Sequence, residues 1–336
     1  MKHALCNTLY AIASLVLIAP VAARDDHGDR HRHRRFAWLA NDPANTYDNA
    51  TLAGIEDVAG ARPHAVDPFY AGFDLKRQLA QCREALHSHR YDGLFVEADD
   101  AVGIEPCVAE ARRAGVPVVA TDLPIGADPT TVRPQVPGEV GASFIPAPDW
   151  AKALEKTLPQ ACAGLSPCNI FYLAGDETLA FDRLGFQAVQ SVVAANPSFH
   201  LVGEDQAFYD TATARQVVTN QLTSHPTINL VVAGGDQMAL GAEQAATARG
   251  LAVRIIGAGA GASAIAAVKQ GRWYGTFNAL PRTEGQLGAA IMELHLVDRD
   301  LRPIGVDPIA FSGLPDMWTQ ATLAKYPNFV PQWPGP

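Results

Sequence analysis

The chain has 336 residues, of which 18% are charged and 48% are hydrophobic, so it can bury two cores of ordinary size and is not a disordered chain. Its formal net charge of -9 argues against a general nucleic-acid-binding role, which depends on Lys and Arg to neutralise phosphates. We therefore predict a soluble, acidic, globular protein.

The N-terminus has the pattern of a secretory signal. Lys2 precedes an apolar run at 9–19, and small residues end at Ala23. The run is too short and wrongly flanked to cross a membrane. We expect a signal peptide over residues 1–23 and a freely soluble periplasmic protein. Cys6 lies ahead of the apolar run, so it is not the lipid-modified cysteine of a lipoprotein.

A charged leader is expected over residues 24–35. It contains three histidines, His27, His31 and His33. Such a charge run is usually solvated. Weak metal capture by the three histidines is the alternative.

Short apolar runs recur after the leader, and each ends at Gly, Asp or Pro before a helical pattern. The run 230–233 is the clearest example, because Gly234 and Gly235 follow it as a turn and Asp236 is placed to cap the next helix. Similar runs lie at 36–40, 116–122, 169–175 and 253–259. Strands that alternate with helices predict an α/β fold with parallel sheets, whose ligands bind at the carboxyl ends of the strands.

Four segments occur in an order typical of one family. They are TD at 121–122, LGFQAVQ at 184–190, GGDQMALGA at 234–242 and ALPRTEGQLGAA at 279–290. In these segments the chain resembles the type I periplasmic binding proteins, the ribose- and galactose-binding family that also supplies the sensor domains of LacI-like repressors. The likeness covers about residues 36–301.

The resemblance implies two doubly wound parallel-sheet lobes joined by a three-segment hinge. The expected N-terminal lobe comprises residues 36–147 and 281–306. The expected C-terminal lobe comprises residues 148–280 and 307–336. This topology permits hinge closure over a ligand.

The resemblance also assigns ligand-facing positions just after the strands. In the first lobe they are Asn45, Tyr47, Glu97, Asp122 and Leu123. In the second lobe they are Ala180, Arg183, Phe208, Tyr209, Gly235, Asp236, Gly259, Asn278 and Ala279. Two alternatives stay open, since Asn45 is also suited to capping a helix and Glu97 to a solvated loop.

Polar partners that sugar-binding relatives use are missing from the expected cleft. Their places are taken by Leu123, Ala180, Gly235, Gly259 and Ala279. Each unpaired polar group costs about 1–3 kcal/mol, so five losses exceed the binding free energy of a micromolar complex, about 8 kcal/mol. A cation at Arg183 restores one partner if the helix register shifts by a turn.

These losses predict an enlarged, apolar cleft for a ligand less polar than a simple sugar. Asn45, Glu97 and Asp122 remain available to one hydroxyl or amine at its end. A sterol or another polycyclic lipid fits this description, on family-level analogy.

Four cysteines remain after the signal, an even number in an oxidising compartment. We favour disulfides Cys82–Cys107 and Cys162–Cys168, because the first two lie on neighbouring helices and the last two bracket a short loop. Four buried thiols are the alternative. Zinc or catalytic use is disfavoured, because no Cys-x-x-Cys spacing occurs.

The leading functional hypothesis is a monomeric periplasmic solute-binding protein that delivers a small ligand to an inner-membrane transporter. The alternatives are a periplasmic carrier of sterol-like lipids in a bacterial lipid transport system, a sugar-binding protein and a sensor subunit. An enzyme is disfavoured, because no triad order, metal motif or close carboxylate pair stands out. We expect no cofactor and no metal, since the Gly-rich stretch at 257–261 lacks the spacing of a dinucleotide site.

Overall fold

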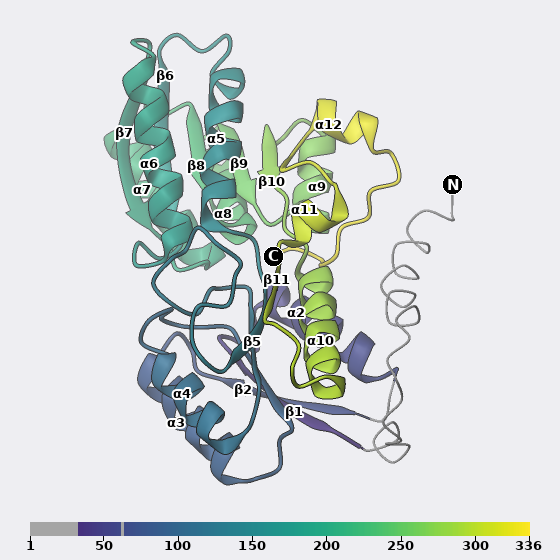
Figure 1. Cartoon of the computed structure of the whole chain (residues 1–336). Coiled ribbons are helices and arrows are strands. Elements are labelled where there is room, and N and C mark those ends of the chain that lie inside the picture. The colour runs from purple at the N-terminus through teal and green to yellow at the C-terminus, as the bar shows by residue number, and fades with distance from the viewer. Residues whose placement is uncertain (1–32, 62–63) are drawn as a thin grey trace. The chain divides into compact units, whose positions relative to one another are not determined.

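The structure is a computed structural model and describes residues 33–61 and 64–336. The expected signal peptide and nearly all of the charged leader lie outside the described residues. Residues 34–336 form one compact unit, which contains two six-stranded sheets (Figure 1). The doubly wound α/β class predicted from the alternating pattern is confirmed.

The first sheet is entirely parallel, with the strand order β11-β5-β4-β3-β1-β2. Its strands are β1 (Arg35–Ala40), β2 (Ala65–Tyr70), β3 (Gly93–Val96), β4 (Val118–Thr121), β5 (Glu139–Ser143) and β11 (Ile304–Val306). The two central strands β3 and β4 are buried along their whole length, as expected of strands with helices on both faces.

The second sheet has the order β12-β10-β9-β8-β6-β7, and only its edge strand β12 is antiparallel. Its strands are β6 (Cys168–Ala174), β7 (Phe199–Gln206), β8 (Leu230–Ala233), β9 (Arg254–Ala258), β10 (Gly275–Phe277) and β12 (Met317–Thr319). The chain passes between the two sheets three times, after β5, after β10 and after β11.

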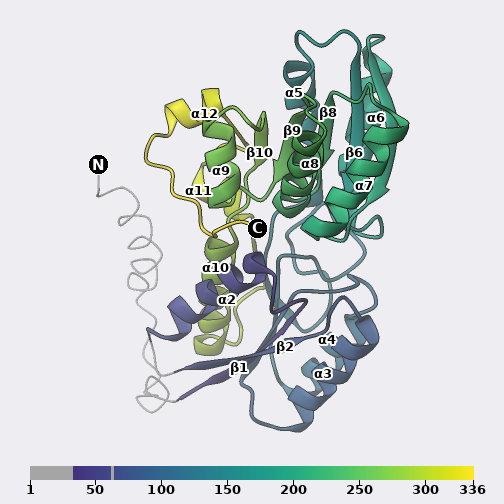
Figure 2. The same cartoon turned by 180° about the vertical axis from the view of Figure 1, so that it is seen from behind.

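Helices cover both faces of the first sheet (Figures 1 and 2). One face carries α2 (Thr46–Ala59) and α10 (Pro281–Val297), and the other carries α3 (Leu75–His87) and α4 (Glu105–Ala114). The backbones of α2 and α10 meet closely, because a Cβ atom added at Gly54 would lie 2.1 Å from the carbonyl oxygen of Arg282. This contact places the start of α10 beside the middle of α2.

The second sheet is covered in the same way. One face carries α5 (Ala147–Ala161), α6 (Ala180–Ala195) and α11 (Pro308–Ser312). The other carries α7 (Thr211–Ser224), α8 (Asp236–Ala248), α9 (Ala262–Lys269) and α12 (Gln320–Lys325). Among the described residues, no helix is long and apolar enough to cross a bilayer.

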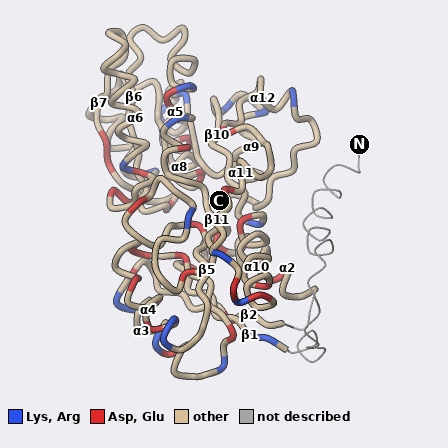
Figure 3. The backbone as a smooth tube through the Cα atoms, in the orientation of Figure 1, with Lys and Arg blue, Asp and Glu red and all other residues tan. Residues whose placement is uncertain are grey.

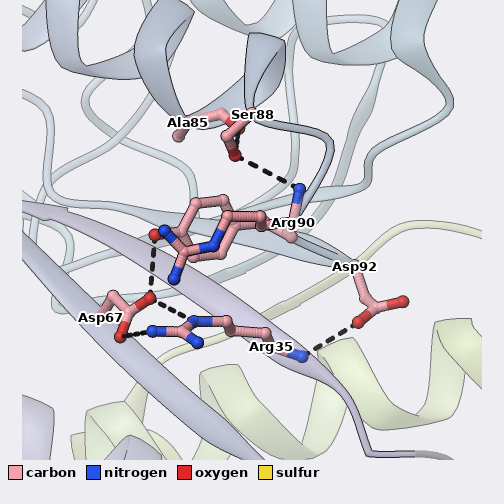
Figure 4. Close-up of polar contacts among 7 residues, drawn as sticks. Arg35, Asp67, Ala85, Ser88, Arg90 and Asp92 are labelled. Carbon is pink, nitrogen blue, oxygen red and sulfur yellow. Dashed lines mark hydrogen bonds and ion pairs between the residues drawn. The ribbon is translucent and has the colours of Figure 1, made fainter.

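A polar network holds the amino-terminal edge of the first sheet (Figure 4). Arg35 on β1 pairs with Asp67 on β2, with Nη2 donating to Oδ1 at 2.8 Å. Tyr91 donates its hydroxyl to Asp67 Oδ2 at 2.8 Å, and the amide of Arg35 donates to Asp92 Oδ2 at 2.9 Å. Arg35, which we expected in the leader, is thus the first residue of β1.

Several element boundaries differ from the prediction. The run expected over 116–122 is a strand only at Val118–Thr121. The edge strand β2 includes Pro68, which an edge strand tolerates because its outer amide needs no ladder partner. Asp236 is the first residue of α8, while Gly235 is its N-cap without a side-chain hydrogen bond. The expectation that Asp236 caps this helix is wrong.

Both favoured cysteine pairs are disulfide-bonded in the structure. Cys82 on α3 is joined to Cys107 on α4, across a sequence separation of 25 residues. Cys162 at the end of α5 is joined to Cys168 at the start of β6. The first disulfide therefore ties together two helices on one face of the first sheet, and the second ties α5 to a strand of the second sheet.

Candidate functional site

A cavity of about 380 Å³ lies where the carboxyl ends of the strands of both sheets converge. This is the position that parallel α/β sheets use for ligands. Its lining includes these residues expected from the sequence, Asn45, Tyr47, Glu97, Asp122, Leu123, Ala180, Arg183, Tyr209, Gly235, Gly259 and Ala279.

Three expected residues do not line the cavity. Phe208 has a positive φ of 51°, and its side chain is 55% exposed at the surface. Asp236 is fully buried and accepts hydrogen bonds from Thr276 Oγ1 at 2.7 Å and from the amide of Gly261 at 2.9 Å. Asn278 accepts a hydrogen bond from Trp318 Nε1 at 2.9 Å. Asp236 and Asn278 thus fix loops behind the cavity wall.

The first sheet contributes an acidic end to the cavity. Glu97 follows β3, is only 2% exposed, and accepts a hydrogen bond from Asn41 Nδ2 at 2.7 Å. Asp122 follows β4 in a left-handed conformation, with φ 62°, and its amide donates to Glu284 Oε1 at 3.0 Å. Tyr47 donates its hydroxyl to Glu284 Oε2 at 3.2 Å. Loops after β1, β3 and β4 and the first turns of α2 and α10 therefore bring these side chains together.

Burial dominates the titration of these carboxyl groups. Desolvation raises the pKa of Glu97 well above its usual value, and nearby Asp48 and Asp122 raise it further. Desolvation also raises the pKa of Asp122 to about 6, although hydrogen bonds from Tyr47 and Glu97 oppose the rise. Glu284 behaves like Glu97, with desolvation as the largest cause. The acidic end therefore retains protons at pH values where exposed carboxyl groups are ionised.

Asn45 has two roles that we had treated as alternatives. Its side chain accepts a hydrogen bond from the amide of Tyr47 at 3.0 Å and caps α2. The same oxygen accepts from Gln237 Nε2 on α8 at 3.4 Å. Asn45 therefore lines the cavity and links loops of the two sheets.

The second sheet contributes Tyr209 to the cavity wall, and hydrogen bonding and packing hold this side chain in place. Tyr209 donates its hydroxyl to Asp182 Oδ2 at 2.6 Å, and the amides of Gly175 and Asp176 donate to the same carboxylate at 2.8 and 3.0 Å. Desolvation raises the pKa of Asp182 to about 6, against these hydrogen bonds. A Cβ atom at Gly175 would lie 2.1 Å from the Tyr209 ring. The tyrosine ring is therefore a rigid wall, held by a carboxylate that we did not identify from sequence.

The space left by the missing polar side chains is partly filled by aromatic rings. A Cβ atom at Gly259, where φ is 139°, would lie 2.6 Å from Trp333 Cζ2. The indole of Trp333 donates Nε1 to the carbonyl oxygen of Gly259 at 2.7 Å and meets the Tyr47 ring edge to face at 5.6 Å. A Cβ atom at Gly235 would lie 2.9 Å from the Tyr209 ring. The expectation that these losses simply enlarge the cleft is therefore wrong.

Within the described part of the chain, no buried basic residue replaces the cations missing at Leu123 and Ala180. Arg183 is the one Lys or Arg among the described residues that line the cavity. It is exposed, and its Nη1 donates to the carbonyl oxygen of Thr178 at 3.1 Å. Among the described residues there is also no group of three or more His, Cys, Asp or Glu side chains placed to hold a metal ion.

Several lining residues were missed by sequence reasoning, among them Asn41, Phe181, Gln237 and Trp333. Asn41 directly follows β1, so its position after a strand was a usable signal. Gln237 lies one position beyond Asp236 in a segment already singled out. No signal pointed to Trp333, because it reaches the cavity from the last residues of the chain.

The chain is similar to known binding proteins. A model of the periplasmic binding protein domain matches residues 36–300. The ribose import binding protein of Bacillus subtilis is 25% identical over 286 residues, which cover 83% of this chain and 87% of that protein. The ribose import binding protein of Salmonella typhimurium is 32% identical over 204 residues, which cover 60% of this chain and 64% of that protein.

Solved structures share the fold at lower sequence identity. A periplasmic solute-binding protein of an ABC transporter from Actinobacillus succinogenes, with bound D-allose, has a TM-score of 0.73 and 22% identity, covering 87% of this chain and 100% of that one. The Caulobacter myo-inositol binding protein, bound to myo-inositol, has a TM-score of 0.74 and 20% identity, covering 88% of this chain and 96% of that one.

Proposed function

The chain belongs to the periplasmic binding protein domain family, and on this premise we propose that it captures one small hydroxylated compound and delivers it to an inner-membrane transporter. Its relatives are substrate-binding proteins of importers and not enzymes, in agreement with our expectation. In this proposal the protein acts as a monomer in the periplasm and closes its two lobes over the ligand through the three crossing segments.

The arrangement of the cavity is the observation that carries the proposal. One end offers polar groups, from Asn41, Glu97 and Asp122, and the walls are largely apolar, with Leu123 and Trp333 among them. A site of this kind orients a ligand by a few hydrogen bonds and holds the remainder by apolar contact. It suits a sugar-like compound that has an apolar face or substituent.

The size of the cavity and the nature of the relatives bear on the alternative ligand, a sterol-like lipid. About 380 Å³ is near the lower end of the range for small-molecule sites, which is about 300–1,000 Å³. Import proteins for ribose, together with the structures bound to D-allose and myo-inositol, favour a hydroxylated ligand. Sterols are therefore included among the compounds of the ligand screen. A sensor subunit, the other alternative, would bind its ligand in the same cavity.

Ligand screening tests the proposal directly. We would measure the thermal stability of the purified protein with pentoses, hexoses, inositols, aryl glycosides and sterols, and then titrate each stabilising compound by calorimetry. We expect a hydroxylated compound with an apolar substituent to stabilise the protein most. Stabilisation by sterols alone would select the lipid carrier, and stabilisation by no hydroxylated compound would refute the proposal.

A matched pair of variants tests the location of the site. Asn41→Ala removes a polar side chain that lines the cavity, and loss of its hydrogen bond to the ligand, about 1–1.5 kcal/mol, should weaken binding about tenfold. Asn220→Ala changes an exposed residue of α7 outside the cavity and should leave the affinity unchanged. Equal affinities for the two variants would place the ligand elsewhere.

A further inference from the structure

The polar end of the cavity contains more hydrogen-bond acceptors than donors. Buried oxygens without a hydrogen-bond partner among the described residues belong to three lining residues, with Oδ1 of Asn41, Oε2 of Glu97 and both carboxylate oxygens of Asp99. The side chains of Asn41 and Glu97 are 1% and 2% exposed. Unsatisfied buried acceptors are costly, so these oxygens favour a ligand that brings hydrogen-bond donors, beyond the proton that Glu97 and Asp122 can share.

The donors around these oxygens are already engaged. Tyr47 interacts with Glu284 and with Asp122, and Gln237 donates to Asn45. Arg183 donates to the carbonyl oxygen of Thr178 and is exposed. Figure 3 marks the acidic positions along the backbone, including those on loops after the strands of the first sheet. The missing donors must therefore arrive with the ligand or with the solvent.

An ammonium group matches this end of the cavity. It carries one positive charge and three donors and has no acceptor. A hydroxyl supplies a single donor and adds an acceptor of its own. A metal ion is a poorer match, because no group of three or more candidate side chains among the described residues is placed to hold one.

We propose that the ligand carries a basic nitrogen, as in an amino sugar or an amino polyol, and that its ammonium group is bound by Asp122, Glu97 and Asn41. This inference rests on the proposed function, since it specifies the ligand of the same cavity. Asp122 is partly exposed to the cavity and makes the direct ion pair, while the more deeply buried Glu97 lies behind it.

The empty cavity is neutralised in a different way. Because desolvation raises the pKa values of Glu97 and Asp122, the pair shares a proton when no ligand is present. Binding of the ammonium group replaces this proton as the neutralising charge. Ligand binding should therefore release a proton to the buffer.

Calorimetric titration of the wild-type protein tests the inference. The probes are D-glucosamine, D-galactosamine and the 1-amino-1-deoxy alditols, each compared with its neutral parent at pH 7.5. We expect at least one amine to bind at least about tenfold more tightly than its parent, equivalent to about 1.4 kcal/mol. Titrations in phosphate and HEPES, whose ionisation enthalpies differ, should show the release of up to about one proton per amine bound.

Two variants separate a role in binding from a role in folding. Asp122→Asn should reduce the preference for the amine over its neutral parent below about threefold. Glu97→Gln should have the same effect, and it serves as the test if Asp122→Asn does not fold. Asp300→Asn, an exposed carboxylate outside the cavity, should keep the full preference. The fold of each variant is checked by circular dichroism.

The outcomes separate the two proposals. If the neutral parents bind and no amine binds more tightly, or if amines bind without proton release, the ammonium inference is wrong and the proposed function stands. Stabilisation by Ca²⁺ or Mg²⁺ alone, with competition against the amines, also overturns the inference. If no hydroxylated compound binds, with or without an amine, both proposals fail.

Discussion

Replacement of Trp333 tests how the C-terminal tail completes the cavity. The side chain is 3% exposed, and its indole nitrogen donates to Gly259 at 2.7 Å. Loss of a buried tryptophan costs about 3–5 kcal/mol when replaced by alanine. We expect the lower end for Trp333→Ala, about 3 kcal/mol, because one side of the ring borders the cavity and the site can partly collapse.

Trp333→Phe separates the hydrogen bond from the packing. It keeps an aromatic ring over Gly259 but leaves the carbonyl oxygen of that residue without its donor, at a cost of about 1 kcal/mol. Urea unfolding measures both free energies, and titration with the identified ligand measures the affinity. Trp333→Ala should lower the affinity as well, because it removes a wall of the site.

Val330 provides the control on the same tail. Its side chain is 75% exposed, so Val330→Ala should change the free energy of unfolding by less than about 0.5 kcal/mol. The account of the tail is refuted if Trp333→Ala costs less than about 1 kcal/mol and binds ligand as tightly as the wild-type protein. In that case the indole would be neither a core side chain nor a wall of the cavity.

The other predictions concern the disulfides, the buried carboxyl groups and the tyrosine. Replacing Cys82 and Cys107 by alanine opens a loop of 25 residues and should cost about 3 kcal/mol in urea unfolding; a cost below about 1 kcal/mol would contradict the loop-entropy argument. Asp122 has a pKa raised from 3.8 to about 6, so between these pH values the folded chain binds more protons than the unfolded chain. Its contribution to stability should therefore fall by about 2 kcal/mol as the pH rises through this window, and Asp122→Asn should flatten the pH dependence of the melting temperature. Tyr209→Phe removes the donor to Asp182 and should cost about 1–2 kcal/mol while keeping the ring against the cavity; an unchanged free energy of unfolding would show that the hydrogen bond is not needed.

The positions of the strand ends were predictable because they follow from local pattern. A short apolar run between two helical patterns, such as 230–233, is expected to be a buried parallel strand. The carboxyl ends of such strands lie at the edge of the sheet where ligands bind. The family resemblance assigned Glu97, Asp122 and Gly235 to positions just after strands, and all three line the cavity. It failed for Asp236 and Asn278, because adjacent residues at a strand end point in opposite directions and the pattern does not say which one faces the cavity.

The sequence by itself determined the α/β class, the parallel sheets and the strand ends at which the cavity lies, since periodicity and turn residues act over a few neighbours along the chain. Only the tertiary structure decided what the cavity offers. Trp333 and Gly259 are 74 residues apart, and Asn41 and Glu97 are 56 apart, so their contacts depend on the packing of distant segments. That packing decides whether a missing side chain leaves a void or is replaced by an indole ring. It also decides whether a buried acceptor has a hydrogen-bond donor.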